Sequence, residues 1–207
     1  MNTRWLLAAA LLAVGLAAPA DARHGKAAQP VDWKAVITTD DLGRLHKWRE
    51  AFVQALSEAR AAGFGAAIAS EGALLDPDSA LESATLPGGR YRCRVLKLGS
   101  TTRGAVRYSA APALDCRVAD EGGVLSFTKM DGTQRPVGLV FSNDPRRNIF
   151  LGTVMFSDET SAIDYGRDAA RDLVGAVERV GDKRWRMILP YPHFESVLDV
   201  IELVPAG

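Results

Sequence analysis

The sequence predicts a mainly β protein, namely an antiparallel β-barrel of about nine strands, lipocalin-like in outline and preceded by an N-terminal amphipathic α-helix. Short apolar or alternating runs recur about every ten residues after residue 90, and Gly, Asn, Asp and Pro separate them. A stretch with helical periodicity precedes these runs. So many antiparallel strands would leave exposed edges in an open sheet, and closing the sheet into a barrel removes them.

Residues 1–22 have the features of a secretory signal peptide. Arg4 supplies the positive charge, an uncharged apolar run follows to residue 18, and small residues offer cleavage after Ala20 or Ala22. The run is shorter than the roughly 20 residues that a membrane-spanning helix needs. We therefore expect an exported protein, periplasmic or secreted, with no membrane span after cleavage.

The remaining chain has the length of one domain. Cleavage removes one basic and one acidic residue, so the formal charge stays at zero and nothing indicates a nucleic-acid partner. We expect a loose mature N-terminus over 23–38 and a single, monomeric domain over 39–207. Within it, 39–72 is predicted to be helical, 73–89 to be a connecting segment, and 90–207 to form the barrel.

The first predicted element is an amphipathic helix over 41–62. Asp40 can cap its N-terminus, and Leu45, Trp48 and Phe52 belong to its apolar face. Gly63 suits the position after the helix, where a left-handed backbone is favoured. A second short helix is predicted over 66–70.

The strands follow from residue 90 onward. Alternating or apolar runs bounded by turn residues predict strands at 90–98, 105–109, 114–119, 124–130, 137–141, 149–156, 173–180, 184–189 and 197–204.

The runs 173–180 and 184–189 flank Gly181-Asp182-Lys183, which predicts a β-hairpin. A three-residue loop would place Val180 opposite Arg184, Arg179 opposite Trp185 with the guanidinium on the indole, and Glu178 opposite Arg186. Part of this stretch also has helical spacing, but glycines at 175 and 181 disfavour a helix.

Cys93 and Cys116 are the only cysteines, and both lie on predicted strands. An even number of cysteines in an exported protein predicts a structural disulfide. The alternative, a redox or catalytic thiol, would need a second nearby cysteine or an activating histidine.

Arginines supply the candidate ligand-binding residues. Arg92 and Arg94 alternate with apolar residues on one strand, and guanidinium groups recognise phosphate or carboxylate. The other candidates are Arg167, Arg184 and Arg186, from the polar C-terminal region. The alternative is a solvated face, or one paired with Glu178, Glu202 or the acidic segment 71–82.

Candidate catalytic residues also lie near the C-terminus, namely Glu178, His193, Glu195 and Asp199. Two carboxylates near an imidazole suit acid–base chemistry, and His193, Ser196 and Asp199 could form a triad. No nucleophile elbow surrounds Ser196. Ion pairs inside the barrel or across its strands are the alternative role.

No cofactor or metal site is expected. The three histidines are widely spaced, whereas zinc needs three or four converging ligands. No glycine-rich phosphate loop joins a strand to a helix.

Several sequence blocks resemble those of one known family. They are GALLDP at 72–77, YRCRVLKLG at 91–99, QRPVGL at 134–139, FLGT at 150–153, YGRD at 165–168, ERVGDKRWR at 178–186 and FESVLDVIELVPA at 194–206. The chain thereby resembles family 4893 of the domains of unknown function, which are small exported bacterial proteins. The resemblance implies an exported single domain and assigns no catalytic residue.

These observations favour a non-enzymatic binding module of the bacterial envelope. It would recognise a small ligand or a protein partner, and one version is an inhibitor. The alternative hypothesis is a hydrolase that uses the C-terminal carboxylates and His193.

Overall fold

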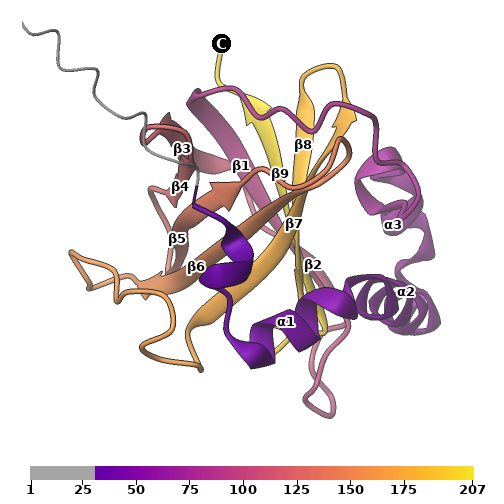
Figure 1. Cartoon of the computed structure of the whole chain (residues 1–207). Helices are drawn as coiled ribbons and strands as arrows, with labels where there is room; N and C mark the ends of the chain where they lie inside the picture. Colours follow the sequence, from indigo (N-terminus) through magenta and orange to yellow (C-terminus); the bar gives the residue numbers. More distant parts are fainter. Residues whose placement is uncertain (1–30) are drawn as a thin grey trace, which may run out of the picture.

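The computed structural model describes residues 31–207, which form a closed β-barrel with helices along one side (Figure 1). The predicted signal peptide, residues 1–22, and the following residues to 30 lie outside the described residues. The rest of the predicted loose N-terminus contains a short 3-10 turn, η1 (Trp33–Ala35).

The described residues form nine strands in one sheet. They are β1 (Gly89–Leu98), β2 (Tyr108–Ala110), β3 (Leu114–Asp120), β4 (Leu125–Lys129), β5 (Gln134–Phe141), β6 (Asn148–Phe156), β7 (Asp172–Gly181), β8 (Arg184–Pro190) and β9 (Leu198–Pro205).

Eight of these strands close into an antiparallel barrel. The order is β1-β3-β4-β5-β6-β7-β8-β9, and β9 returns to pair with β1 from Tyr91↔Pro205 to Leu98↔Leu198. The short β2 is an additional strand beside the second half of β1. The predicted antiparallel barrel is confirmed, and the closure leaves few free edges.

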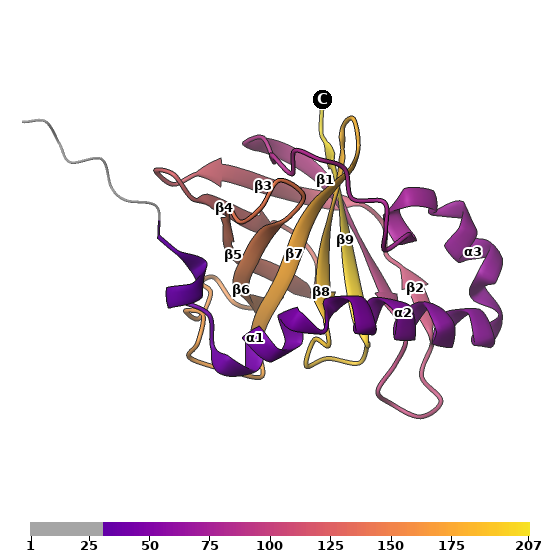
Figure 2. The same ribbon diagram turned by 45° about the vertical axis from the view of Figure 1, so that its right-hand side comes forward.

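The helical segment precedes the barrel in the chain. Its elements are α1 (Thr39–His46), α2 (Trp48–Ala59), the π-helical turn η2 (Arg60–Phe64), α3 (Gly65–Ser70) and the 3-10 turn η3 (Gly72–Leu75). Figure 2 shows α1 and α2 one after the other along the side of the barrel, with α3 beyond them.

The prediction of a single helix over 41–62 was wrong in two respects. The helix breaks at Lys47, whose φ of −94° and ψ of 12° depart from α-helical values. Its N-cap is Thr38, whose side chain accepts a hydrogen bond from the Asp41 amide, and Asp40 lies within the first turn. Gly63 adopts the predicted left-handed conformation, with a φ of 92°.

Side chains fill most of the barrel interior. An eight-stranded barrel is just wide enough for its side chains to fill it, or for one small ligand. Phe127 and Phe150 meet edge to face at 5.9 Å, and Tyr91 and Trp185 do so at 6.1 Å. The barrel is therefore a packed core for most of its length.

The outer face of β1 changes along its length. Arg92 and Arg94 lie outside the barrel at the start of the strand, whereas Leu96 and Leu98 lie on the same outer face and pack under α2 with Phe52. The strand thus passes from an exposed to a buried setting without a bulge.

Gly138 on β5 and Gly152 on β6 are paired across the sheet and face the interior. A Cβ on Gly138 would lie 2.3 Å from the Leu151 carbonyl oxygen, and one on Gly152 would lie 2.3 Å from that of Val137. The two strands can approach in this way only because both positions lack a side chain.

The predicted hairpin forms, but part of its register differs. Glu178 pairs with Arg186 and Arg179 with Trp185, as predicted, whereas a bulge puts Gly181 opposite Arg184 in place of Val180. Trp185 points into the barrel and donates from its indole nitrogen to Thr85 O, while Arg179 donates to Glu82 O and Ser83 O. The predicted stacking of guanidinium on indole is therefore wrong.

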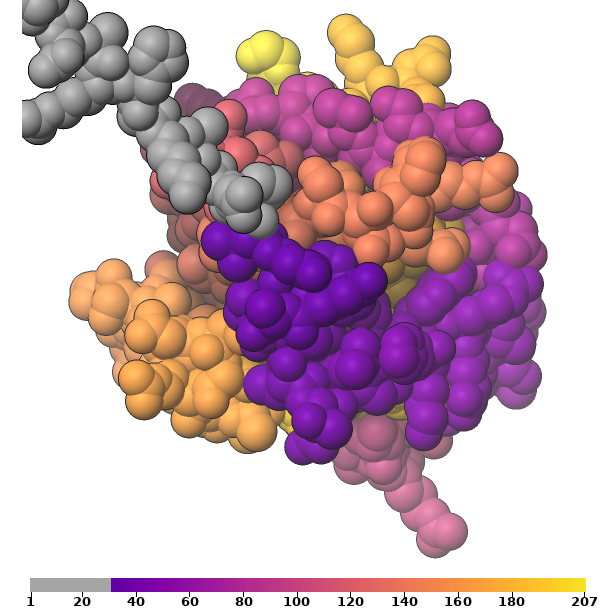
Figure 3. All heavy atoms as spheres, viewed as in Figure 1, coloured from indigo at the N-terminus to yellow at the C-terminus, as the bar shows by residue number. Residues whose placement is uncertain are grey.

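One end of the barrel is covered by residues 79–87, which we call the strap. The Tyr91 hydroxyl donates to Pro87 O at 2.6 Å, and the Asn148 side chain donates to Ala84 O at 2.9 Å. In Figure 3 the strap runs above the helical segment on the face shown. The opposite end, which we call the mouth, lies where β1 ends and β9 begins, away from the C-terminus in Figure 1.

Candidate functional site

Three charged side chains point into the barrel at the mouth. Lys97 continues the inward face of β1 after Tyr91, Cys93 and Val95, because alternate residues of a strand share a face. By the same alternation Lys129 ends the inward face of β4. Asp199 begins that of β9.

The two lysines border an apolar recess with a volume of about 240 Å³, and Asp199 lies next to it as the partner of Lys97. Its apolar lining comes from strands around the barrel, from the segment between β2 and β3 and from the loop between β8 and β9, and includes Val95, Leu114, Pro136, Val154, Leu173 and Phe194. Phe194 meets Phe156 edge to face at 5.8 Å. The recess is thus a small apolar chamber with charged groups at its rim, which is the usual composition of a small-ligand site.

Lys129 is 5% exposed. Its ammonium group donates hydrogen bonds to Asp131 O and, at 3.3 Å, to Gln134 O. Burial lowers the pKa of Lys129, because removal from water disfavours the charged form. Both partners are neutral backbone oxygens, so the described residues provide this cation with no ion-paired carboxylate.

Lys97 has a carboxylate partner. Its Nζ lies 3.3 Å from Asp199 Oδ2, and Asp199 Oδ1 accepts a hydrogen bond from Ser196 Oγ at 2.5 Å. Burial raises the pKa of Asp199, which is 8% exposed. Lys97 and Asp199 therefore form a partly buried ion pair beside the recess.

The loop 191–197 brings Phe194 over the recess in an unusual backbone conformation. Tyr191 and Glu195 both have positive φ, 45° and 46°, which is uncommon for residues other than glycine. The Tyr191 amide donates to Val197 O, and Ser196 is held by Asp199. These bonds fix the loop at the mouth.

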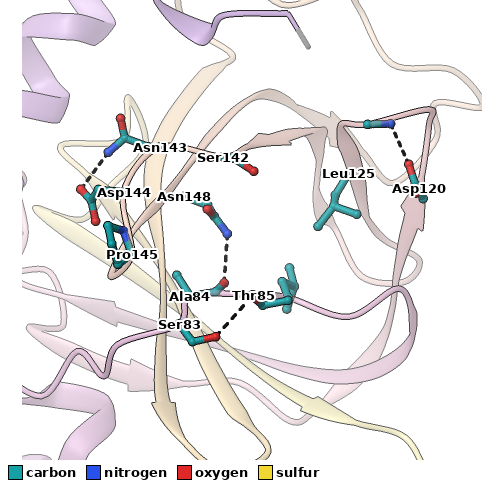
Figure 4. A pocket seen from close by; sticks show the side chains of 12 residues that line it. Ser83, Ala84, Thr85, Asp120, Leu125, Ser142, Asn143, Asp144, Pro145 and Asn148 are labelled. Atoms are coloured by element: carbon teal, nitrogen blue, oxygen red, sulfur yellow. Dashed lines mark hydrogen bonds between the residues drawn. The ribbon is translucent and has the colours of Figure 1, made fainter. Parts of the chain in front are cut away.

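A second cavity of about 570 Å³ lies beneath the strap at the covered end (Figure 4). Its polar groups largely bond within the protein. Asp120 accepts hydrogen bonds from the backbone amides of Gly122 and Gly123. Asp144 accepts one from the Asn143 side chain, and the Asn148 side chain donates one to the strap. This cavity has a mixed lining that includes Leu86 and Leu125, and its polar groups stabilise the turns and the strap.

The predicted ligand-binding arginines of the strands lie outside the barrel. Arg92 pairs with Asp115 at 2.5 Å, and Arg94 pairs with Glu71 and Glu202. Arg184 also pairs with Glu202, at 2.6 Å. Arg94 and Arg184 thus belong to one network on the outer face, the paired arrangement that the sequence left as an alternative.

Arg186 and Glu178 form a fully buried pair between the barrel and η3. Arg186 NH2 lies 2.6 Å from Glu178 Oε2, and NH1 donates to the carbonyls of Ala73, Leu74 and Asp76. Arg147 also contacts Glu178. The pair therefore joins η3 and the residue that follows it to the outer face of the barrel.

The structure does not gather the four candidate catalytic residues. Glu195 and Asp199 both lie within 4.0 Å of Lys97 Nζ at the mouth, whereas Glu178 lies on the outer face and His193 in the exposed loop between β8 and β9. Ser196 donates directly to Asp199, and no hydrogen bond joins His193 to either residue in the described part of the chain. Burial, followed by the charge of Arg44, lowers the pKa of His193.

Arg167 lies in the exposed loop before β7, close to a buried network that links this loop to α1. The Tyr165 hydroxyl donates to Asp41 Oδ2 at 2.6 Å and accepts from the Thr38 amide at 3.2 Å. Burial and the bond to Asp41 raise the pKa of Tyr165. The YGRD block thus connects the helix to the sheet.

Cys93 and Cys116 lie at disulfide distance inside the barrel, with their Cα atoms 5.9 Å apart. They link β1 to β3 next to Tyr91.

Over residues 31–207, no cluster of three or more His, Cys, Asp or Glu side chains is arranged to hold a metal ion. No helix in that range has the length and apolar character needed to cross a membrane.

The sequence reasoning missed Lys97 and Lys129. A signal for both exists in the strand alternation, because each lysine occupies the next inward position after a run of apolar inward residues. A charged residue that continues an apolar stripe marks the point where a barrel interior becomes polar.

The structure defines the class of protein, a small closed antiparallel barrel with helices along one side and an apolar recess at its mouth. The profile of the family described as Domain of unknown function (DUF4893) matches residues 33–203, so the chain belongs to that family. No curated protein and no solved structure matches the chain.

Proposed function

We propose that this protein is an exported, monomeric binding module of the bacterial envelope, and that it holds a small, mainly apolar ligand in the mouth of its barrel. The observation that carries the proposal is the recess itself. Side chains fill the middle of the barrel, yet a chamber of about 240 Å³ with an apolar lining remains at the mouth, apart from the cavity beneath the strap at the other end. Chambers of this kind, with few polar groups at the rim, are typical ligand sites.

Export is part of the proposal and rests on two features. The first 22 residues have the composition of a signal peptide. The cysteine pair at disulfide distance suits an oxidising compartment. Cell fractionation of the host, with and without residues 1–22, tests the periplasmic or secreted location.

The alternative function, a hydrolase that uses Glu178, His193, Glu195 or Asp199, has less support. Catalysis of this type needs either a nucleophile in contact with a base or two free carboxyl groups facing one substrate bond. Glu178 forms ion pairs with two arginines, Arg147 and Arg186. The Ser196 hydroxyl donates its hydrogen bond to the carboxylate of Asp199, whereas a catalytic serine would donate to an imidazole. A panel of ester and glycoside substrates with His193→Ala as the comparison would reveal such an activity.

Native mass spectrometry of protein purified from the periplasm of its host tests the binding proposal. We expect a small molecule that is released on denaturation. Val154→Phe should remove it by filling the chamber, whereas Val204→Phe, outside the barrel and 38% exposed, should retain it. A protein adduct of fixed stoichiometry that persists in Val154→Phe would instead indicate a partner protein, for example the target of an inhibitor.

A further inference from the structure

The charges at the mouth are unevenly placed, because the two nearby carboxylates, Asp199 and Glu195, both lie within 4.0 Å of Lys97 and neither is ion-paired with Lys129. Two lysines and one aspartate point inward there, and the aspartate is paired with Lys97. Glu195, 4.0 Å from Lys97 Nζ, is 72% exposed and lies in the loop. The recess therefore contains one cation, Lys129, without an ion-paired carboxylate among the described residues.

Lys129 also has unused hydrogen-bonding capacity. An ammonium group has three donors, and the described residues accept two hydrogen bonds from it, at Asp131 O and Gln134 O. Asp131 supplies its backbone oxygen, while its side chain is on an exposed turn. Burial opposes the ammonium form although the charge of Asp131 favours it, and no carboxylate among the described residues is ion-paired with Lys129. A buried cation is unfavourable, and an anion that enters the recess would relieve this.

We propose that Lys129 makes the recess selective for a small monocarboxylic acid with a short apolar body. This inference rests on the proposed function and names its ligand class. The carboxylate of the ligand would accept a hydrogen bond from the third N–H of the Lys129 ammonium group. The apolar body of the ligand would lie against Val154 and Leu173. A bond between two charged groups is stronger than one between neutral groups.

Size and charge favour this ligand class over two others. Sites for drug-sized molecules occupy about 300–1,000 Å³, so a chamber of about 240 Å³ suits a smaller body. A phosphate monoester would bring a charge of about −1.5 to −2, more than a single unpaired lysine neutralises. A monocarboxylate matches that lysine.

The test compares three probes that share one apolar body, namely hexanoate, 1-hexanol and hexylammonium. Isothermal titration is carried out on the mature protein after native mass spectrometry shows the chamber empty. We expect hexanoate to bind about tenfold or more tightly than hexanol, since hydrogen bonds to charged groups are the stronger kind. Hexylammonium should bind most weakly.

Variants separate Lys129 from general surface charge. Lys129→Met keeps the length of the side chain and should abolish the preference for hexanoate while hexanol binding remains. Arg117→Met removes an exposed cation outside the barrel and should leave the preference intact. Lys129→Gln keeps a hydrogen-bond donor without the charge and should also remove most of the preference for hexanoate, which gives a second test if Lys129→Met fails to fold.

The outcomes distinguish this inference from the proposed function. Equal binding of hexanoate and hexanol by the wild-type protein would overturn the role of Lys129 and leave the apolar ligand site standing. Failure of all three probes to bind the empty chamber would overturn the ligand site, and the inference with it.

Discussion

Lys97 and Asp199 are direct partners across the β1–β9 pairing that closes the barrel, with Nζ 3.3 Å from Oδ2. The pair lies where the first and last barrel strands meet, beside the recess. Its two members differ in setting, because the Lys97 side chain is 25% exposed and the Asp199 side chain 11%. For Asp199 burial is the dominant influence, and it raises the pKa despite the lysine.

Asp199 should make stability fall as pH rises. A carboxyl group whose pKa is higher in the folded than in the unfolded state binds more protons when folded. The stabilisation that Asp199 contributes is fully present below its pKa in the unfolded state, about 3.9. It is lost as pH rises through the pKa of Asp199 in the folded state. Urea unfolding of wild type and Asp199→Asn between about pH 4 and pH 7 should show the wild type losing stability relative to the variant.

Subtracting the Asp199→Asn curve removes the contributions of the other titrating groups. A difference that stays constant across this pH range would show that the folded protein does not perturb Asp199. A difference of opposite slope would show that the charge of Lys97 outweighs burial.

Glu178→Gln should destabilise the protein strongly. The change leaves Arg186, which is fully buried, without its charged partner. Removing one partner of a buried pair costs about 3–5 kcal/mol. Urea unfolding measures this loss. Asp78→Asn is the matched control, since its pair with Arg49 is exposed and should change stability little.

Similar stabilities for Glu178→Gln and Asp78→Asn would contradict the structural role of the buried pair. Such a result would favour a functional role for the Glu178 carboxylate.

Replacing both cysteines by alanine should lower the free energy of unfolding by about 3 kcal/mol, the entropic effect expected for a loop of about this length. The two residues are 23 positions apart in sequence. Reductant should destabilise the wild type and leave the double variant unchanged. A wild type that is indifferent to reductant would show that the pair is not bonded under those conditions.

The strands could be predicted from sequence because each is a short run with its own turn signals. The sequence predicts a strand at 149–156, and β6 is Asn148–Phe156. The break at Lys47 could not be predicted, because it depends on tertiary packing. Leu45 in α1 packs with Phe141, Ile149, Leu151 and Val174, whereas α2 packs over β1, β8 and β9. One straight helix would not follow the curved surface of the barrel.

The recess was harder to predict than the fold. Lys129 precedes an Asp-Gly turn, and such a lysine is ordinarily solvent-exposed. Its burial follows from barrel closure, which directs the end of β4 inward. The arginines are dense in sequence and so predict a ligand site, yet their acidic partners come from other segments of the chain, as Glu71 does for Arg94. Charge pairing across a fold has no local sequence signal.

Gly152→Ala should destabilise the barrel, while Gly43→Ala should stabilise it. A Cβ at residue 152 would lie 2.3 Å from Val137 O and 2.5 Å from the Phe150 ring, so strands β5 and β6 must separate or the ring must move. Overpacking of this kind costs about 1–3 kcal/mol. Gly43 is exposed in α1 with nothing within 4 Å of the added atom, and alanine is favoured over glycine there by about 1 kcal/mol. Thermal and urea unfolding of the two variants should therefore move in opposite directions. Stabilisation by Gly152→Ala would show that the close approach of β5 and β6 is not required. The recess, which Val154 on the same strand lines, would then have a different shape.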